Sequence, residues 1–248
     1  MIRIDNGFLY FDTDKTIYTK KKMTGHDFVE LLELNKYNKK GDKILNIFKI
    51  FKPPFDNKYL YRGDYAESLV RYYYQKQNRP FVWYDENAKK QNNFDFFPTY
   101  KQCGGIPDLE MQDESEIIEV KSKSMKDYDK IAVEKDIPQE ELYQALFYGY
   151  LRKVEKITMF YVFFDVETEQ LVFENKQPNT LNNIKLYKKT YNMNDYYNDV
   201  ESKIKEALHY YNKCVYEKRI SLADISPKVL NEVRSKYGIW WTNLFTRR

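Results

Sequence analysis

The feature that most constrains the fold is residues 104–124, GGIPDLEMQDESEIIEVKSKS, in which charged and aliphatic side chains alternate. Residues 113–116 (DESE) predict a four-residue hairpin loop, a common connection between antiparallel strands. Side chains alternate between the two faces of a strand. This register therefore collects three carboxylates and one ammonium on one face of the hairpin, as the pairs Asp108–Lys121 and Glu110–Glu119.

Such a face poses an electrostatic problem, because carboxylates that oppose each other across a hairpin repel. Lys121 alone cannot neutralise three acids, whereas a divalent cation can, and carboxylate oxygens suit Mg²⁺ or Mn²⁺. The two cysteines and two histidines are too few for a zinc or iron–sulfur site. The alternative is a solvated hairpin face with Lys121 in a surface ion pair, which is nearly neutral for stability.

Further polar residues fall on helices before and after this hairpin. Glu67 lies in a helix predicted at about 61–77, where its simplest partner is Arg71 at i+4. Gln144 and Tyr148 lie four residues apart on a helix predicted from 138 to about 153, so both reach the same side of that helix. The alternative for this pair is a core tyrosine beside a surface glutamine.

The rest of the chain predicts an α/β core with helical layers at both ends. Thr24 is a plausible N-cap for the first helix. We expect a strand or hairpin at 2–12, helices at 26–34, 41–51 and from 194 with a break at 225–227, strands at 80–84, 98–103, 157–165 and 171–175, and a polar loop at 85–93.

Length and composition favour one intracellular domain. A chain of 248 residues suits a single domain covering 1–248. No apolar stretch is long enough to cross a bilayer, and residues 1–15 lack the plan of a signal peptide, so we expect a cytoplasmic protein with no membrane partner. Net charge is +4, and basic runs accompany 24 tyrosines. That mixture suits nucleic acid, although an AT-rich genome encodes the same residues.

The ordered set of polar residues resembles the PD-(D/E)xK nuclease superfamily. Its "PD" is Pro107-Asp108 and its "ExK" is Glu119-Val120-Lys121. The run from Gln144 to Tyr148 is similar to the QxxxY motif of phage lambda exonuclease-like (viral recombinase) members. Residues 23–37 (MTGHDFVELLELNKY) and 61–67 (YRGDYAE) resemble the opening helices of that branch. The resemblance covers residues 20–175, with 194–248 as a helical extension, and it implies a restriction-endonuclease-like core with a central mixed sheet flanked by helices.

The resemblance also implies roles for the site residues. Asp108, Glu119, the Val120 carbonyl and Glu67 would hold Mg²⁺, with Mn²⁺ substituting. Lys121 would orient water and stabilise phosphorane charge, or act as the base if burial lowers its pKa. Gln144 would orient Lys121. Contacts to nucleic acid are expected from Arg62, Lys123, Tyr148, Lys20, Lys21 and Lys22.

The function implied is a metal-dependent exonuclease that degrades linear duplex DNA from its ends, 5′ to 3′, in phage-type recombination. A ring-shaped homotrimer, a single-strand annealing partner and a bacterial or phage-infected cytoplasm follow from the same resemblance. Two alternatives stay open. One is a restriction-type endonuclease on the same core, and the other is a nucleic-acid-binding protein without activity.

Overall fold

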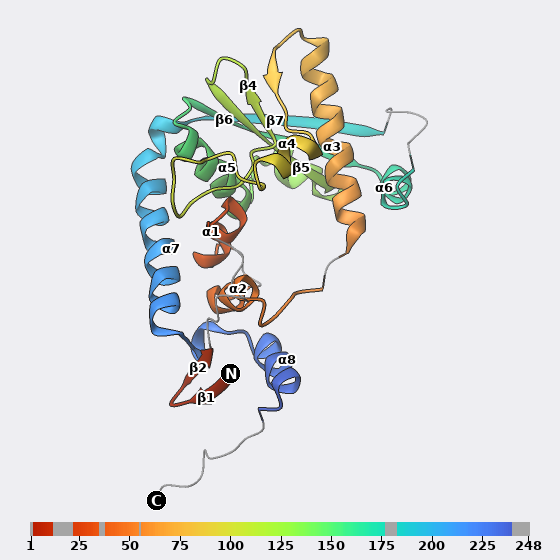
Figure 1. Cartoon of the computed structure of the whole chain (residues 1–248). Coiled ribbons are helices and arrows are strands. Elements are labelled where there is room, and N and C mark those ends of the chain that lie inside the picture. Colours follow the sequence, from red (N-terminus) through yellow and green to blue (C-terminus); the bar gives the residue numbers. More distant parts are fainter. Residues whose placement is uncertain (1, 12–21, 35–37, 55, 177–182, 240–248) are drawn as a thin grey trace, which may run out of the picture. The chain divides into compact units, whose positions relative to one another are not determined.

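The computed structural model describes residues 2–11, 22–34, 38–54, 56–176 and 183–239 (Figure 1). The chain forms two compact units, Phe55–Glu201 and Met1–Pro54 with Ser202–Arg248. Helices and strands alternate in the first unit, so the predicted α/β class is confirmed. The single nuclease domain over 1–248 stays a prediction. Among the described residues, no helix is both long and apolar enough to cross a membrane.

The unit Phe55–Glu201 contains a five-stranded sheet in the order β3-β4-β5-β6-β7. Strands β5 and β6 are parallel, and every other neighbouring pair is antiparallel, so the sheet is mixed as predicted. The strands are β3 (Phe81–Val82), β4 (Leu109–Met111), β5 (Glu116–Ser124), β6 (Lys156–Phe164) and β7 (Ile184–Asn192).

Strand β6 is the most deeply buried strand of this sheet, because its sequence, KITMFYVFF, is apolar on both faces. A strand with both faces covered needs such a continuous apolar run. Helix α3 (Asn57–Lys76) covers one face, where it packs Ala66, Val70 and Tyr74 on Ile118, Val120, Phe160 and Val162. Helix α5 (Gln139–Arg152) covers the other face, where Gln144 bonds to Lys121 of β5 and Glu141 to Tyr161 of β6.

Three local predictions in this unit are wrong. Residues 98–103 form no strand, because 98–102 are turns and bends and Cys103 makes only an isolated bridge. The expected loop at 85–93 contains helix α4 (Glu86–Gln91), capped by Asp85, whose side chain accepts from the Ala88 amide. Residues 171–175 belong largely to helix α6 (Val166–Phe173), because Asp165 caps it through the Thr168 amide. The partner of β6 is instead β7.

The other unit joins segments from both ends of the chain. Strands β1 (Ile2–Asp5) and β2 (Phe8–Phe11) form the hairpin expected at 2–12, and β8 (Arg219–Ser221), not predicted, pairs with β2. Thr24 and Asp27 form a capping box at α1 (Gly25–Leu31), which confirms the predicted N-cap. The remaining helices are α2 (Lys40–Ile47), α7 (Tyr197–Glu217), which begins in the sheet unit, and α8 (Pro227–Tyr237). Short turns of helix occur at Met125–Asp127, Asp129–Val133, Met193–Asp195 and Leu222–Asp224.

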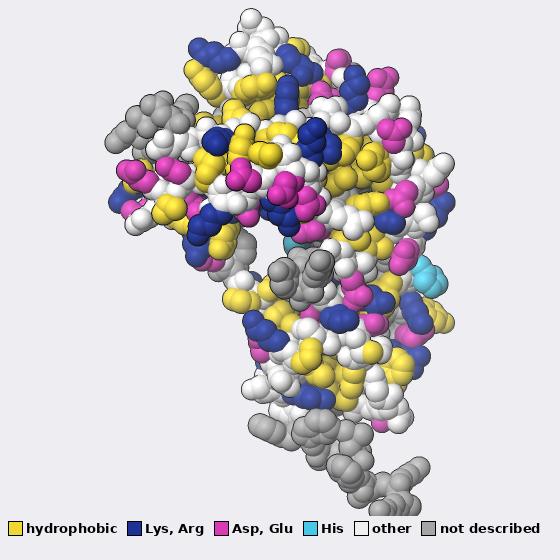
Figure 2. All heavy atoms as spheres, turned by 180° about the vertical axis from the view of Figure 1, so that it is seen from behind, with side chains coloured by type: hydrophobic (Ala, Val, Ile, Leu, Met, Phe, Trp, Pro, Cys, Tyr) yellow, Lys and Arg dark blue, Asp and Glu magenta, His cyan; other side chains and the backbone are white. Residues whose placement is uncertain are grey.

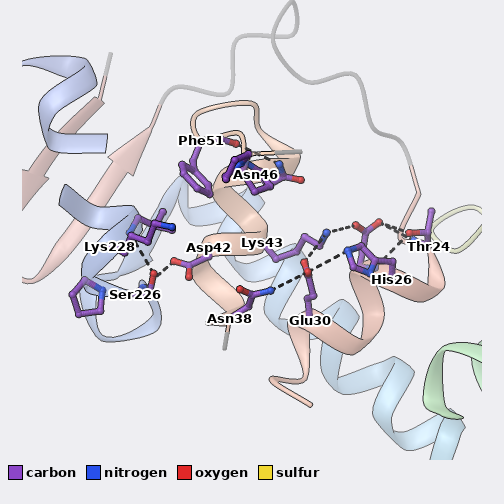
Figure 3. A pocket seen from close by; sticks show the side chains of 15 residues that line it. Thr24, His26, Glu30, Asn38, Asp42, Lys43, Asn46, Phe51, Ser226 and Lys228 are labelled. Carbon is purple, nitrogen blue, oxygen red and sulfur yellow. Dashed lines mark hydrogen bonds and ion pairs between the residues drawn. The ribbon is translucent and has the colours of Figure 1, made fainter. Parts of the chain in front are cut away.

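A cavity of about 810 Å³ lies between α1, α2 and the start of α8 (Figure 3). Lys43 is only 6% exposed and lies between two acids, with its Nζ 3.1 Å from Asp27 Oδ1 and 2.7 Å from Glu30 Oε2. Glu30 also lies 3.2 Å from His26 Nε2. Burial alone would raise the pKa of Glu30, but His26 and Lys43 outweigh burial and lower this pKa. Lys43 forms ion pairs with both acids, so we assign the cluster to stability.

We predict that Lys43→Met lowers the free energy of unfolding by about 3–5 kcal/mol, because the buried Asp27 and the largely buried Glu30 lose their cation. Lys39→Met is the matched control, since Lys39 is half-exposed and lies at the 4.0 Å limit of an ion pair with Glu33. Its effect should stay within about 0.5 kcal/mol. Urea unfolding of the two variants beside the parent measures both values. Equal losses would contradict a structural role for Lys43.

Candidate active site

The β4–β5 hairpin carries most of the candidate site residues. Leu109 pairs with Ile118 and Glu110 with Ile117, so the loop is 112–115 and the predicted register is wrong. The turn sets this register, because the Asp113 carboxylate accepts from both the amide and the hydroxyl of Ser115. Each β4 residue pairs with a β5 residue two positions away from the predicted partner. Because side chains alternate between faces, a shift of two keeps every side chain on its predicted face.

Glu110 is removed from the acidic cluster by this register. Its carboxylate accepts hydrogen bonds from Arg152 Nη2 at 2.7 Å and from the Tyr84 hydroxyl at 3.2 Å. It is buried, and Arg152 balances its charge. Glu110 therefore ties the hairpin to Arg152 of α5. Asp108, not Glu110, faces Glu119 across the hairpin.

Asp108 is fastened to β5 by one hydrogen bond. It directly precedes β4, and its Oδ2 accepts from the Val120 amide at 2.7 Å. Its side chain is therefore held beside Glu119. Desolvation and the negative charge of Glu67 raise the pKa of Asp108 above its ordinary value. A positively charged ligand next to this carboxyl group would stabilise its charged form.

Glu119 has one satisfied and one unsatisfied oxygen. It is 1% exposed, and its Oε1 accepts from Lys121 Nζ at 2.8 Å. Its Oε2 is buried and has no hydrogen-bond partner in the described part of the chain. Burial and the nearby Asp108 raise the pKa of this carboxyl group. An orphaned buried carboxylate oxygen is costly unless a ligand completes it.

Lys121 connects the acids to α5. Its Nζ donates to Gln144 Oε1 at 3.0 Å as well as to Glu119, so the predicted contact with Gln144 is present. Burial would lower the pKa of Lys121, but Glu119 and Asp108 outweigh burial and raise this pKa. Lys121 would act as a base only if its pKa were lowered. Its pKa is raised instead, so the ammonium form is favoured.

Glu67 approaches the two carboxylates from α3. Burial raises the pKa of Glu67, and the charges of Asp64 and Glu119 add to the effect, while Lys89 and Arg71 oppose it. Lys89 also acts on Asp108. Sequence reasoning missed Lys89 because residues 85–93 were expected to form a loop, although Asp85 followed by ENAKKQ has the signature of a capped helix.

The residues fit a hard divalent cation held by two carboxylates. In the described ranges, no three Asp, Glu, His or Cys side chains lie close enough to hold an ion by themselves. Asp108 and Glu119 are adjacent, and Glu119 Oε2 is free to bind. Mg²⁺ commonly takes one or two carboxylates and completes its shell with water and phosphate oxygens. The donor set fits that pattern.

Tyr148 lies beneath the loop that carries Asp108. It is 5% exposed, and its ring stacks on Phe97 with 5.8 Å between ring centroids. Gly105 in that loop has φ +127°, and a Cβ there would come within 2.8 Å of the Tyr148 hydroxyl oxygen. Tyr148 thus supports the loop, and its burial favours this role over a direct contact with nucleic acid.

The basic residues proposed for nucleic-acid contact are placed differently from one another. Arg62 donates to the side chain and carbonyl of Ser122 and pairs with Glu169. Lys123 pairs with Glu141. Lys22 is described and partly buried, whereas Lys20 and Lys21 lie outside the described residues.

Comparisons with known proteins cover the part of the chain that contains these residues. The model of a family described as the YqaJ-like viral recombinase domain matches residues 18–150, a range that includes all the polar motif residues from Glu67 to Tyr148. The uncharacterized protein MG373 of Mycoplasma genitalium is 34% identical over 107 residues, which are 43% of this chain and 36% of that protein. The match thus spans about a third of that relative.

Two solved structures share the fold. A phage related exonuclease from Haemophilus somnus 129PT aligns with a TM-score of 0.52 at 13% identity, over 79% of this chain and 96% of that one. An alkaline exonuclease (LHK-Exo) from Laribacter hongkongensis aligns with a TM-score of 0.53 at 12% identity, over 90% of this chain and 100% of that one.

We predict that Gly105→Ala destabilises the protein by about 1–3 kcal/mol, because alanine is strained at this positive φ and its Cβ meets Tyr148. Gly63→Ala is the control. Gly63 lies inside α3 with open space around it, so alanine should stabilise the helix by up to about 1 kcal/mol. Urea unfolding checks both signs, and a neutral Gly105→Ala would contradict the account of the loop.

Proposed function

The chain belongs to the YqaJ-like viral recombinase domain family, and we propose on this basis that it is a divalent-metal-dependent DNA exonuclease. The observation that carries the proposal is the set of contacts around Glu119. This buried carboxylate lies beside Asp108, is bonded to Lys121, and keeps one oxygen unsatisfied. Buried acids next to a lysine suit the metal-assisted hydrolysis of a phosphodiester.

The residues that would hold Mg²⁺ or Mn²⁺ are Asp108 and Glu119, joined by the Val120 carbonyl, with Glu67 directly or through water. When bound, the metal supplies Lewis acidity and lowers the pKa of a coordinated water. Asp108 is held for this task by the Val120 amide. Glu67 belongs to helix α3, whereas the other proposed ligands belong to the β4–β5 hairpin, so the ligands would come from two layers of the fold.

Lys121 would stabilise the charge that develops on the phosphate. Gln144 and Glu119 fix its ammonium from two sides, which prepares it to donate to the attacking water or to a phosphate oxygen. A donor that is already oriented needs little rearrangement during the reaction. Tyr148 would act indirectly, by supporting the loop before Asp108.

The substrate proposed is linear duplex DNA, digested from its ends in the 5′-to-3′ direction during phage-type recombination. The family description supports the recombination role. Arg62 and Lys123 would contact phosphates once their present partners are exchanged for DNA, and Lys20 to Lys22 would add further phosphate contacts. A ring-shaped homotrimer, a single-strand annealing partner and action in a bacterial or phage-infected cytoplasm belong to the same proposal.

We predict that Lys121→Ala lowers turnover on linear duplex by at least about 10²-fold, the lower range for one electrostatic or acid–base group. Affinity for DNA without divalent metal should change little, because the proposed role is confined to the transition state. Lys126→Ala, an exposed lysine five residues further on, is the matched control and should keep full turnover. Near-parental turnover of Lys121→Ala would make Lys121 a structural residue.

Digestion of end-labelled linear duplex beside covalently closed circles tests the exonuclease. With Mg²⁺, we expect progressive loss of label from linear DNA, faster with a 5′-phosphate because phosphate oxygens accept charge-assisted hydrogen bonds. Closed circles should resist, and higher salt should weaken binding steeply. Discrete internal fragments from closed circles, at rates that match linear DNA, would favour the endonuclease alternative.

A further inference from the structure

Strand β7 forms an edge of the five-stranded sheet. It pairs with β6 on one side, and no described strand pairs with its other side over the nine residues Ile184–Asn192. A long edge strand presents a row of backbone N–H and C=O groups that can pair with another extended chain. Proteins usually protect such an edge, so what surrounds β7 decides what it can bind.

An apolar groove of about 300 Å³ runs beside this edge, between β7 and α3. Tyr72 is 51% exposed and Leu186 is 44% exposed. The groove is lined chiefly by Leu69, Tyr72, Tyr73, Lys76, Ile184 and Leu186. The upper part of Figure 2 shows hydrophobic side chains exposed beside Lys and Arg on one face of the molecule. Exposed apolar grooves rimmed by polar groups are typical of binding sites.

The two faces of β7 differ in chemistry. Leu186 pairs with Val162 and Lys188 with Phe160, so the even-numbered residues share the groove face. Lys185 and Lys189 point to the other face, where their ammonium groups lie 4.0 Å from the Tyr128 ring centre and 5.0 Å from that of Tyr191. An added strand would therefore meet an apolar groove on one face and two lysines on the other.

The rim of the groove is electropositive. Lys76 and Lys188 lie over the rings of Tyr72 and Tyr73, and no carboxylate in the described ranges lies within ion-pair distance of these two lysines or of Lys185 and Lys189. The hydrogen bond with Gln77, assisted by Lys188, lowers the pKa of the Tyr73 phenol. The groove therefore favours an occupant with negative charge.

A second copy of β7 and the nuclease substrate both fit this surface poorly. Pairing β7 with itself would set lysines against lysines, which destabilises a strand pair. On α3, the groove residues follow Glu67 by 2, 5, 6 and 9 positions. At 3.6 residues per turn they lie between about 140° and 240° around the helix axis from Glu67. The groove is thus on the side of α3 opposite the candidate active site.

We propose that β7 and this groove bind an extended acidic segment of a partner protein, which adds a strand to the sheet. In strand addition, main-chain hydrogen bonds provide affinity and alternate side-chain pockets provide specificity. The segment would alternate, with apolar side chains entering the groove beside Leu186 and carboxylates meeting Lys185 and Lys189. The proposal does not depend on nuclease activity.

Fluorescence anisotropy with the full chain tests the proposal. The probe is a fluorescein-labelled nonapeptide that alternates Val and Glu, and its comparators replace every Glu by Lys or every Val by Ser. We expect saturable binding of the Val/Glu peptide and at least tenfold weaker binding of both comparators. Two further versions of the Val/Glu peptide carry N-methyl groups on alternate residues, one version on each set. One of the two should lose binding, because its backbone donors toward β7 are blocked. Failure of the Val/Glu peptide to bind at millimolar protein would overturn the proposal.

Variants locate the binding surface. Leu186→Asp, and separately Lys185→Glu with Lys189→Glu, should each weaken binding of the peptide at least tenfold. Lys126→Glu, on an exposed turn of the same unit, is the control and should bind as the parent does. Leu186→Asp should retain its circular dichroism spectrum and its rate on linear DNA. Unchanged peptide affinity in the β7 variants, or a single-stranded oligonucleotide that binds there in place of the peptide, would contradict the acidic segment.

Discussion

The hydrogen bond from the Val120 amide to Asp108 is the contact on which the candidate site depends. It holds Asp108 against β5 beside Glu119, although two neighbouring carboxylates repel and both are partly or wholly desolvated. An unsatisfied buried polar group costs about 1–3 kcal/mol, and more when it is charged. The surroundings therefore have to stabilise these acids, and a bound cation would remove part of that cost.

The surrounding fold supplies that stabilisation. Strand β6 is buried over nearly its whole length and anchors β5 in a parallel pair, so Glu119 and Lys121 are fixed by a continuous ladder. Helix α3 packs on one face and brings Glu67, while α5 packs on the other and brings Gln144. Tyr148 and Gly105 hold the loop before β4. Glu67, Glu119, Lys121 and Gln144 thus belong to elements that are packed for independent apolar reasons, and Asp108 lies in the loop beside them.

Features set by local pattern were predictable from the sequence. The alternation in residues 104–124 identified the face that carries Asp108, Glu119 and Lys121, and the i, i+4 spacing placed Gln144 on a helix that reaches it. The prediction of register failed because the Asp113–Ser115 turn begins one residue early. Residues 171–175 are apolar enough for a strand, and only the cap at Asp165 marks them as helix.

Features set by tertiary partners were not predictable. Arg152 neutralises Glu110 from 42 residues away, and Glu169 engages Arg62 from 107 residues away. Contacts between residues so far apart in the sequence leave no pattern in it. Strand β7 was missed because an edge strand with exposed lysines lacks a clean apolar alternation. Strand β8 was missed because its three residues gain their partners only when both ends of the chain meet.

We propose that Asp108 and Glu119 form a metal site that the free oxygen of Glu119 completes. Anomalous diffraction from crystals of the full chain grown with saturating Mn²⁺ tests it most directly. We expect an anomalous peak between the two carboxylates, with Glu119 Oε2 among the ligands. Well-ordered carboxylates with no anomalous peak between them at saturating Mn²⁺ would contradict the account.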